Sequence, residues 1–456
     1  MKRLVLALSL IVAASPVSAA AETGPAATGR VLTSGLADPY EITWGPDGFI
    51  WATEKTGLRV VRIDPRTGAK KTAVTIPDAV HTDWRQNGVL GMALHPGLLH
   101  GRDHVFVAYT YDSDPGTAEA LRTKIVRYTY DSHTEQLGQQ VDVITGLPGG
   151  VDHQSARLVF GPDAKLYYTI GDQGAGQFEE MCEPNLAQRL PTAAEVRDKD
   201  WTAYRGKVLR LNQDGSIPAD NPVIDGVRSH VLTYGHRNAQ GLVFGTNGIL
   251  YSSEQGPKTD DEIDIISRGK NYGWPNVAGY RDDNAYVYAN WAAAPDCQDL
   301  EFSDFEIPPS VPVTRESAWS NRDFVPPIRT FHTVPSDHNF KDPKCAEDEQ
   351  WYLCWPTVAP AGLDYVPRGG YRNSLLMPAL KDGTVYRLVL SPDGKCVTSV
   401  EPLWRSTNRY RDTAISPDGK TFYVATDSSG STKDETGTPT NELANPGSIL
   451  EFKLGS

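Results

Sequence analysis

The stretch "LVFGPDAKLYYTIGD", residues 158–172, places two alternating apolar segments on either side of a tight turn. Proline presets φ in such a turn, and aspartate bonds to its own backbone, so the stretch predicts a β-hairpin. Glycine completes the turn in most copies of the motif. The same pattern recurs at five other places, at residues 42–54, 92–109, 242–254, 388–400 and 413–427. The sequence therefore predicts an all-β protein built from repeated hairpins.

Radial repetition of hairpins predicts a β-propeller, which leaves only short, protected strand edges. The chain contains 41 glycines and 33 prolines, long helical periodicity is scarce, and only residues 188–201 suggest a short helix. Six blades in residues 22–456 would average roughly 73 residues, against ~40–45 in compact blades. The excess, including a long excursion at 291–350, predicts loops that form a cleft on one face of a single domain. Seven or eight blades remain open from the repeats alone.

The first 21 residues are predicted to be a signal peptide. A charged start is followed by the apolar run 4–14 and by small residues near Ala19 to Ala21. We therefore expect a periplasmic or secreted protein, and no later run reaches the roughly 20 apolar residues of a membrane span. The net charge is −13, and loss of Lys2 and Arg3 with the leader would leave −15. Such acidity excludes nucleic acid as an expected partner.

Five cysteines in an exported chain cannot all pair with one another. Cys345 and Cys354 are separated by eight residues and predict one disulfide, because a short loop closes at modest entropic cost. The partners of Cys182, Cys297 and Cys396 stay open. A structural zinc site is the alternative, but no C-x-x-C spacing supports it.

His153 and Asp172 flank the hairpin at 158–172. In an antiparallel pair, the residue before the first strand and the residue after the second lie at the same edge. An aspartate that accepts from one imidazole nitrogen leaves the other nitrogen free to remove a proton, so the pair predicts a general base and its orienting group. The alternative is a histidine that only caps a turn.

Two further segments place polar groups beside strand ends. Arg237, next to Asn238, could stabilise developing negative charge or could form an ion pair between blades. The segment 252–266 combines the backbone around Gly256 and Pro257 with several acids, which suits Ca²⁺ as well as a solvated turn.

Three later cations form a second group. Arg409 and Arg411 share one side of an extended segment, and Lys381 precedes them. Together with Arg237 they predict a ligand with several carboxylates or phosphates. Trp355 could lie against a flat ring or a sugar, although core packing is the ordinary role of tryptophan.

Seven segments taken together resemble the soluble, periplasmic quinoprotein glucose dehydrogenase family, which uses pyrroloquinoline quinone (PQQ). They are "DHQSARLVFGPDAKLYYTIGDQG", "GKVLRLNQDGSIPADNP", "GHRNAQGL", "SEQGPKTDDEI", "NYGWPNVAGY", "CWPTVAP" and "NRYRD". The resemblance implies a six-bladed propeller that holds PQQ in a cleft and oxidises the C1 hydroxyl of aldoses to lactones.

The resemblance also implies roles for individual residues. His153 would be the general base, Asp172 would orient it, and Arg237 would stabilise the quinone oxygen as hydride passes from C1. The carbonyls of Gly256 and Pro257 would hold a Ca²⁺ that polarises the quinone. The PQQ contacts would be Asn238, Thr357, Lys381, Arg409, Arg411 and Trp355. The sugar contacts would be Gln86, Asp152 and Tyr352. A further pair of Ca²⁺ sites, associated with a homodimer interface, would use Asp261, Glu262, Tyr272, Ala278, Tyr280, Asp282 and Glu316.

Two other functions compete with this interpretation. A Ca²⁺-dependent propeller lactonase would also place a metal in the central channel, but it needs side-chain ligands there and no cluster of cations. A non-catalytic sugar-binding propeller is the second alternative. The four cations favour the quinone enzyme, whose soluble electron acceptor the sequence leaves unidentified.

Overall fold

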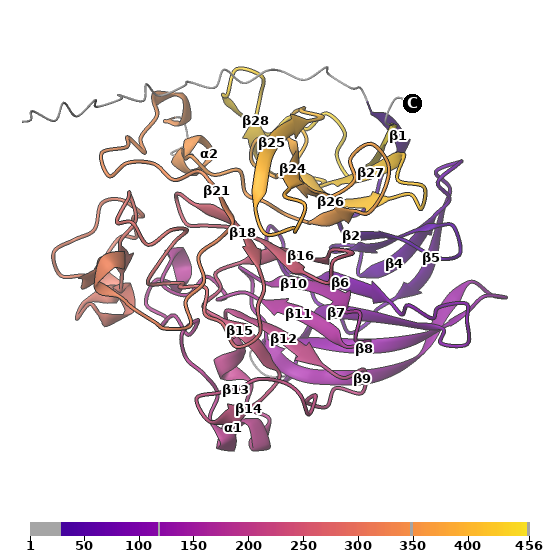
Figure 1. Ribbon diagram of the computed structural model, residues 1–456, viewed down its shortest axis with the longest axis horizontal. Helices are drawn as coiled ribbons and strands as arrows, with labels where there is room; N and C mark the ends of the chain where they lie inside the picture. The colour runs from indigo at the N-terminus through magenta and orange to yellow at the C-terminus, as the bar shows by residue number, and fades with distance from the viewer. Residues whose placement is uncertain (1–28, 117–118, 347–349, 454–456) are drawn as a thin grey trace, which may run out of the picture.

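The computed structural model describes residues 29–116, 119–346 and 350–453, and in them the chain forms six four-stranded antiparallel sheets (Figure 1). These sheets are the blades of a six-bladed β-propeller, as predicted. The expected signal peptide lies outside the described residues. Among the described residues, no helix is long and apolar enough to cross a membrane.

The first three blades follow one another along the chain. Blade one contains β2 (Pro39–Trp44), β3 (Ile50–Glu54), β4 (Arg59–Ile63) and β5 (Lys70–Thr75). Blade two contains β6 (Val89–Leu94), β7 (His104–Asp112), β8 (Leu121–Asp131) and β9 (Gln136–Pro148). Blade three contains β10 (Ser155–Phe160), β11 (Leu166–Ile170), β12 (Lys207–Leu211) and β15 (Val231–Tyr234).

The last blade is completed by the first strand of the chain. Blade four contains β16 (Ala239–Phe244), β17 (Leu250–Glu254), β18 (Asp261–Ile265) and β21 (Arg329–Phe331). Blade five contains β22 (Asp364–Val366), β23 (Ser374–Pro378), β24 (Val385–Leu390) and β25 (Val397–Leu403). Blade six contains β26 (Tyr410–Ile415), β27 (Thr421–Thr426), β30 (Ile449–Lys453) and β1 (Arg30–Thr33), with Arg30 opposite Glu451.

The hydrophobic core is divided among the interfaces between blades. Five buried clusters join residues of two neighbouring blades and a sixth joins blades one to three, and the innermost strands β2, β6, β10, β16, β22 and β26 contact one another in a closed ring. Between blades five and six, for example, Trp404 stacks on Phe452 with 4.2 Å between ring centroids. The ring therefore depends on face-to-face packing of sheets rather than on one central core.

The six predicted hairpins are confirmed, with one difference. Five form the two innermost strands of a blade, whereas 388–400 forms the outer pair, β24 and β25, of blade five. Positive φ at the turns explains their composition: Gly48 has φ 78°, and Ala164 takes the same left-handed region with φ 57°.

Long connections carry the remaining elements. The helix α1 (Ala193–Asp198), predicted within 188–201, begins with a capping box between Thr192 and Glu195. The helix α2 (Trp351–Cys354) follows blade four. Two-stranded ribbons are β13–β14 (Val223–Ile224, Val227–Arg228), β19–β20 (Tyr288–Ala289, Val313–Thr314) and β28–β29 (Thr432–Lys433, Pro439–Thr440). The 3₁₀ turns are Phe178–Glu180, Thr202–Tyr204, Trp291–Ala293, Cys297–Asp299, Glu316–Ala318 and Pro343–Cys345.

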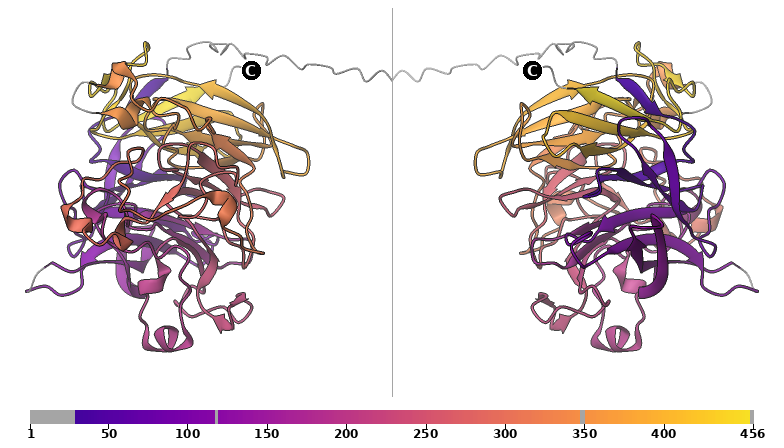
Figure 2. Two further views of the ribbon diagram at one scale, coloured as in Figure 1. Left: turned by 90° about the vertical axis from the view of Figure 1, so that its left-hand side faces the viewer. Right: turned by 90° about the vertical axis from the view of Figure 1, so that its right-hand side faces the viewer.

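The predicted excursion at 291–350 is larger and is interrupted. It runs from 266 to 328 inside blade four, and a second connection, 332–363, follows the short strand β21. The salmon and orange loops of these segments gather beside the sheets in Figure 1, and the left view of Figure 2 faces them.

Two disulfides fix these loops. Cys345 is joined to Cys354, as predicted, and Cys182 is joined to Cys297 across 115 residues. Cys396 is free and exposed. The longer bridge ties the loop after β11 to the excursion of blade four.

Candidate active site

The predicted catalytic and cofactor residues meet at one end of the propeller axis. Each inner strand begins, and each second strand ends, at this edge, because the pair runs antiparallel. The backbone N–H of Asp172 donates to the carbonyl of Arg237 in the next blade at 2.9 Å. Arg237 Nη1 in turn donates to the carbonyl of Gln255, next to Gly256, at 3.2 Å. The base, the guanidinium and the carbonyl loop therefore converge from two blades.

His153 and Asp172 form the expected hydrogen bond. Asp172 Oδ1 lies 2.7 Å from His153 Nδ1 and accepts from the N–H of Gly174 at 3.0 Å. Its Oδ2 accepts from Asn185 Nδ2 at 3.0 Å and from Trp274 Nε1 at 2.7 Å. Burial opposes ionisation, but His153 and the other partners hold the pKa of Asp172 below its ordinary value. A permanent carboxylate at Nδ1 fixes the tautomer in which Nε2 can accept a proton.

Arg237 is buried and is not ion-paired to a carboxylate among the described residues. Nη2 donates to Gln177 Oε1 at 2.6 Å, and the guanidinium lies 5.4 Å from the ring of Trp274. Its Nε is buried without a hydrogen-bond partner in the described part of the chain. Such a cation is held in place by neutral groups and still has a donor to offer to an anion.

Arg409 and Arg411 share one carboxylate, Asp427. Arg411 makes a bidentate pair with it at 2.8 Å for each bond, and Arg409 Nε donates to it at 3.1 Å. Lys55 lies 3.5 Å from Asp38 in the same region. Burial opposes ionisation of Asp427, yet Arg411 and Arg409 lower its pKa to about 2. Three cations face two carboxylates here, so the edge carries a surplus of positive charge.

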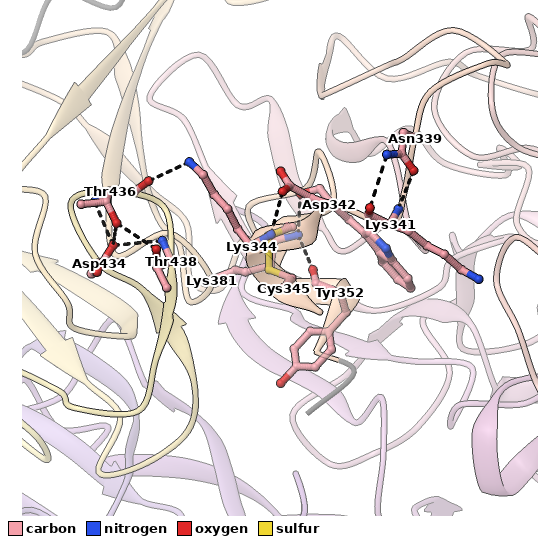
Figure 3. Close-up of a disulfide and its surroundings, with 12 residues drawn as sticks. Asn339, Lys341, Asp342, Lys344, Cys345, Tyr352, Lys381, Asp434, Thr436 and Thr438 are labelled. Atoms are coloured by element: carbon pink, nitrogen blue, oxygen red, sulfur yellow. Dashed lines mark hydrogen bonds between the residues drawn. A yellow bond between two sulfur atoms is a disulfide. The ribbon is translucent and has the colours of Figure 1, made fainter. Parts of the chain in front are cut away.

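Lys381, like Arg237, forms no ion pair with a carboxylate in the described structure. Its Nζ donates to the carbonyls of Tyr352 and Trp355 at 3.0 Å each and to the hydroxyl of Thr357. Figure 3 shows Lys381 passing the disulfide at Cys345 to reach the backbone of Tyr352. Burial lowers the pKa of Lys381 to about 7, although the charge of nearby Asp261 opposes the shift. An ammonium without a carboxylate partner in the described structure is prepared for an anionic ligand.

The loop at Gly256 and Pro257 is fixed by Asp261. Asp261 Oδ1 accepts from the N–H of Gly256 at 2.8 Å, and Oδ2 accepts from the N–H groups of Val358 and Ala359 at 2.6 and 2.8 Å. Within the described residues, the carbonyl oxygens of Gly256 and Pro257 accept no hydrogen bond. These two oxygens are therefore available to a cation.

The remaining predicted residues lie around the same edge. Gln86 Nε2 donates to the carboxylate of Asp152, which also accepts from the N–H of His153 at 2.8 Å. Asn238 is fully buried, and its Oδ1 accepts from the N–H of Ser155 at 3.2 Å. Tyr352 is exposed and lines a groove of about 400 Å³ with Trp355. The indole N–H of Trp355 is buried and has no partner in the described chain.

Among the residues expected to bind further Ca²⁺, Glu262 and Glu316 are buried beside residues 278–283, whereas Asp282 is exposed and Asp261 holds the Gly256 loop. Glu316 accepts from the N–H groups of Ala278 and Asp282 at 3.0 and 3.2 Å, and Glu262 accepts from Gly279. Tyr272 donates to the carbonyl of Ile265, whereas Tyr280 is exposed. Burial and neighbouring acids raise the pKa of Glu262 well above its ordinary value. In the described ranges no three His, Cys, Asp or Glu side chains are gathered tightly enough to hold a metal by themselves.

Sequence reasoning missed several residues of the edge. Asp427 and Lys55 directly follow second strands, and Asp172 follows its strand after one glycine, so the edge rule applied to every hairpin would have found both. Gln177 lies in the same glycine loop as Asp172 and contacts Arg237. Trp274 comes from the excursion of blade four; its segment "NYGWPNVAGY" was part of the resemblance, but no role was assigned to the tryptophan.

Comparison with known proteins agrees with this arrangement. The family model described as glucose/sorbosone dehydrogenase matches residues 36–310. Quinoprotein glucose dehydrogenase B of Acinetobacter calcoaceticus is 46% identical over 434 residues, covering 93% of this chain and 90% of that protein. The aldose sugar dehydrogenase YliI of Escherichia coli is 26% identical over 418 residues, covering 88% of this chain and 90% of its own. The PQQ-bound aldose sugar dehydrogenase of Streptomyces coelicolor has the same fold, with a TM-score of 0.63 at 24% identity, covering 95% of this chain and 99% of its own.

The fold and its polar edge thus define a propeller oxidoreductase. The chain belongs to the glucose/sorbosone dehydrogenase family.

Proposed function

We propose that this dehydrogenase oxidises the C1 hydroxyl of glucose or a related aldose to the lactone, with PQQ and Ca²⁺ bound at the polar edge. The observation that carries the proposal is the convergence of the His153–Asp172 pair, Arg237 and the free carbonyls of Gly256 and Pro257. The 46% identity to a quinoprotein glucose dehydrogenase supports the choice of cofactor and substrate class.

The residues at the edge fit a cofactor with three carboxylates. Lys381 has no carboxylate partner in the described structure, and Arg409, Arg411 and Lys55 outnumber their acids. In the described structure, Arg237 Nε, Gln177 Nε2 and Trp355 Nε1 are buried donors without acceptors. Unsatisfied donors of this kind are costly unless a ligand supplies acceptors. We therefore assign PQQ to the space among these donors, with Asn238 and Thr357 beside it.

The metal assignment rests on the two free carbonyls. Ca²⁺ prefers oxygen ligands and accepts backbone carbonyls. Gly256 and Pro257 supply two such oxygens. Their loop is held in place because the N–H of Gly256 donates to Asp261 Oδ1. Bound there, Ca²⁺ would act as a Lewis acid, and PQQ would accept the hydride from C1.

The protein's own contribution is proton transfer and charge stabilisation. Asp172 keeps the proton of the imidazole on Nδ1, so Nε2 of His153 takes the proton of the C1 hydroxyl. Arg237 supplies a fixed positive charge beside the reaction, and its direct contacts, Gln177 and Trp274, are neutral. Gln86 and Asp152 present polar groups next to His153 for the sugar.

The proposal extends to the finer features that accompany this activity. The residues Asp261, Glu262, Tyr272, Ala278, Tyr280, Asp282 and Glu316 would hold further Ca²⁺ near a homodimer interface. Two disulfides fit an oxidising compartment, which supports a periplasmic or secreted protein. A soluble acceptor would then reoxidise the cofactor.

Reconstitution separates this function from its competitors. The apoprotein with PQQ and Ca²⁺ should reduce a dye in the presence of glucose, and EDTA should abolish the reaction until Ca²⁺ is restored. Lactone hydrolysis without PQQ would favour the lactonase instead, and sugar binding without turnover would favour the binding protein. Dye reduction that is indifferent to chelation would contradict the metal assignment.

A further inference from the structure

Asp304 lines the groove of Tyr352 and Trp355 and takes no part in the chemistry described above. It lies in the excursion of blade four, far in sequence from the catalytic segments, and is partly exposed. It lines a recess that also contains Gln177 and Trp274, which hydrogen-bond to Arg237 and to Asp172 respectively. Within the described residues, no hydrogen bond or ion pair engages its side-chain oxygens. A free acceptor therefore lies in the recess lined by the partners of Arg237 and Asp172.

Asp304 is held rigidly by its neighbours. Phe302 packs on Phe178 with centroids 4.7 Å apart, and Phe305 stacks on Phe340 at 6.2 Å. The backbone carbonyl of Asp304 accepts from Lys258 Nζ. The disulfide between Cys182 and Cys297 ties this excursion to the loop that carries Phe178. The backbone that carries the carboxylate is thus held by contacts on both sides of Asp304.

The surroundings identify the kind of group that Asp304 would bind. It lines the groove of about 400 Å³ that also contains Tyr352 and Trp355. On its other side it lines a recess with Gln177 and Lys258. Aromatic faces beside a free carboxylate suit a sugar, whose rings stack on aromatic surfaces and whose hydroxyls donate to carboxylates.

We propose that Asp304 accepts a hydrogen bond from an aldose hydroxyl other than the one at C1 and so selects among sugars; this assignment rests on the proposed function. A hydrogen bond from a neutral hydroxyl to a charged acceptor contributes enough to change specificity by roughly 10- to 100-fold. Lys258 bonds to the backbone carbonyl of Asp304 and not to the carboxylate. Removal of the carboxylate therefore leaves this contact, and with it the Gly256–Pro257 loop, in place.

The test compares glucose with its 2-, 3-, 4- and 6-deoxy analogues in the wild type and in Asp304→Ala, with PQQ and Ca²⁺ present. One analogue should be a poorer substrate of the wild type by roughly 10- to 100-fold in kcat/KM, and that penalty should disappear in Asp304→Ala. The variant should raise the KM for glucose and leave kcat within about threefold. Its PQQ affinity, measured by absorbance titration, should be unchanged.

Asp299→Ala is the matched control, because it removes an exposed acid from the same excursion. It should keep the wild-type order of sugars. If Asp304→Ala keeps every wild-type penalty, the assignment of Asp304 is wrong while the dehydrogenase stands. A wild type that oxidises no aldose would overturn the proposed function and this assignment with it.

Discussion

Replacement of Asp172 by asparagine tests the catalytic pair most directly. The side chain accepts two hydrogen bonds on each oxygen: His153 and Gly174 on Oδ1, Asn185 and Trp274 on Oδ2. In Asp172→Asn, one of the two positions becomes an NH₂ group that faces two donors. If the amide oxygen stays with Trp274 and Asn185, the NH₂ donates to His153 Nδ1, and the ring proton moves to Nε2.

The imidazole can then no longer accept the hydroxyl proton. The opposite orientation keeps the tautomer but sets the NH₂ against the indole N–H of Trp274, and a buried unsatisfied donor costs about 1–3 kcal/mol. Since general-base catalysis contributes a rate factor of about 10²–10⁴, kcat should decrease by a factor of about that size. Steady-state dye reduction at saturating PQQ, Ca²⁺ and glucose measures the change.

Asn185→Ala is the control for this prediction. It removes one donor from Oδ2 and leaves the bond between His153 and Asp172 intact, so its kcat should stay within about tenfold of the wild type. PQQ should bind both variants with similar affinity. A kcat for Asp172→Asn within threefold of the wild type, with the cofactor bound, would refute the role assigned to the pair.

Three more predictions concern thiols, cofactor affinity and acid stability. Cys396 is the one free cysteine of five, so thiol titration without reductant should find about one thiol per chain in both native and denatured protein; three would contradict the Cys182–Cys297 bridge. Lys381→Met should weaken PQQ binding by roughly 10- to 100-fold, since it removes a charged donor, and an unchanged titration would exclude contact with the cofactor. Arg411 and Arg409 hold the pKa of Asp427 at about 2, below its ordinary 3.8. The carboxylate therefore contributes about 2 kcal/mol of stability above pH 4, and this is lost as the pH falls through about 2. Denaturant unfolding should show that the deficit of Asp427→Asn shrinks over that interval, and a deficit independent of pH would count against the ion pairs.

The sequence predicted those parts of the fold that local patterns encode. Turns with proline, aspartate and glycine located five innermost hairpins, and antiparallel pairing placed His153 beside Asp172. The inner hairpin of blade five, β22 and β23, was missed because its connection "PRGGYRN" lacks that turn. The resemblance, rather than any spacing, supplied the role of Thr357.

Other features could not be predicted because they depend on distant segments. Cys182 and Cys297 are 115 residues apart, and only the folded excursion brings them together. Trp274 reaches Asp172 across 102 residues by the same route. Asp304 belongs to no local motif, because only the folded excursion places it in the groove with Tyr352 and Trp355.

The pairing of β1 with β30 determines at what stage of synthesis the propeller can close. Because the strand nearest the N-terminus completes the sheet formed by the end of the chain, no partial product of synthesis can close the circle. The catalytic edge draws residues from several blades, so it should form only after the last strand has emerged. A chain that ends before Ile449 would consequently fail to bind the cofactor, even though each catalytic side chain is still present.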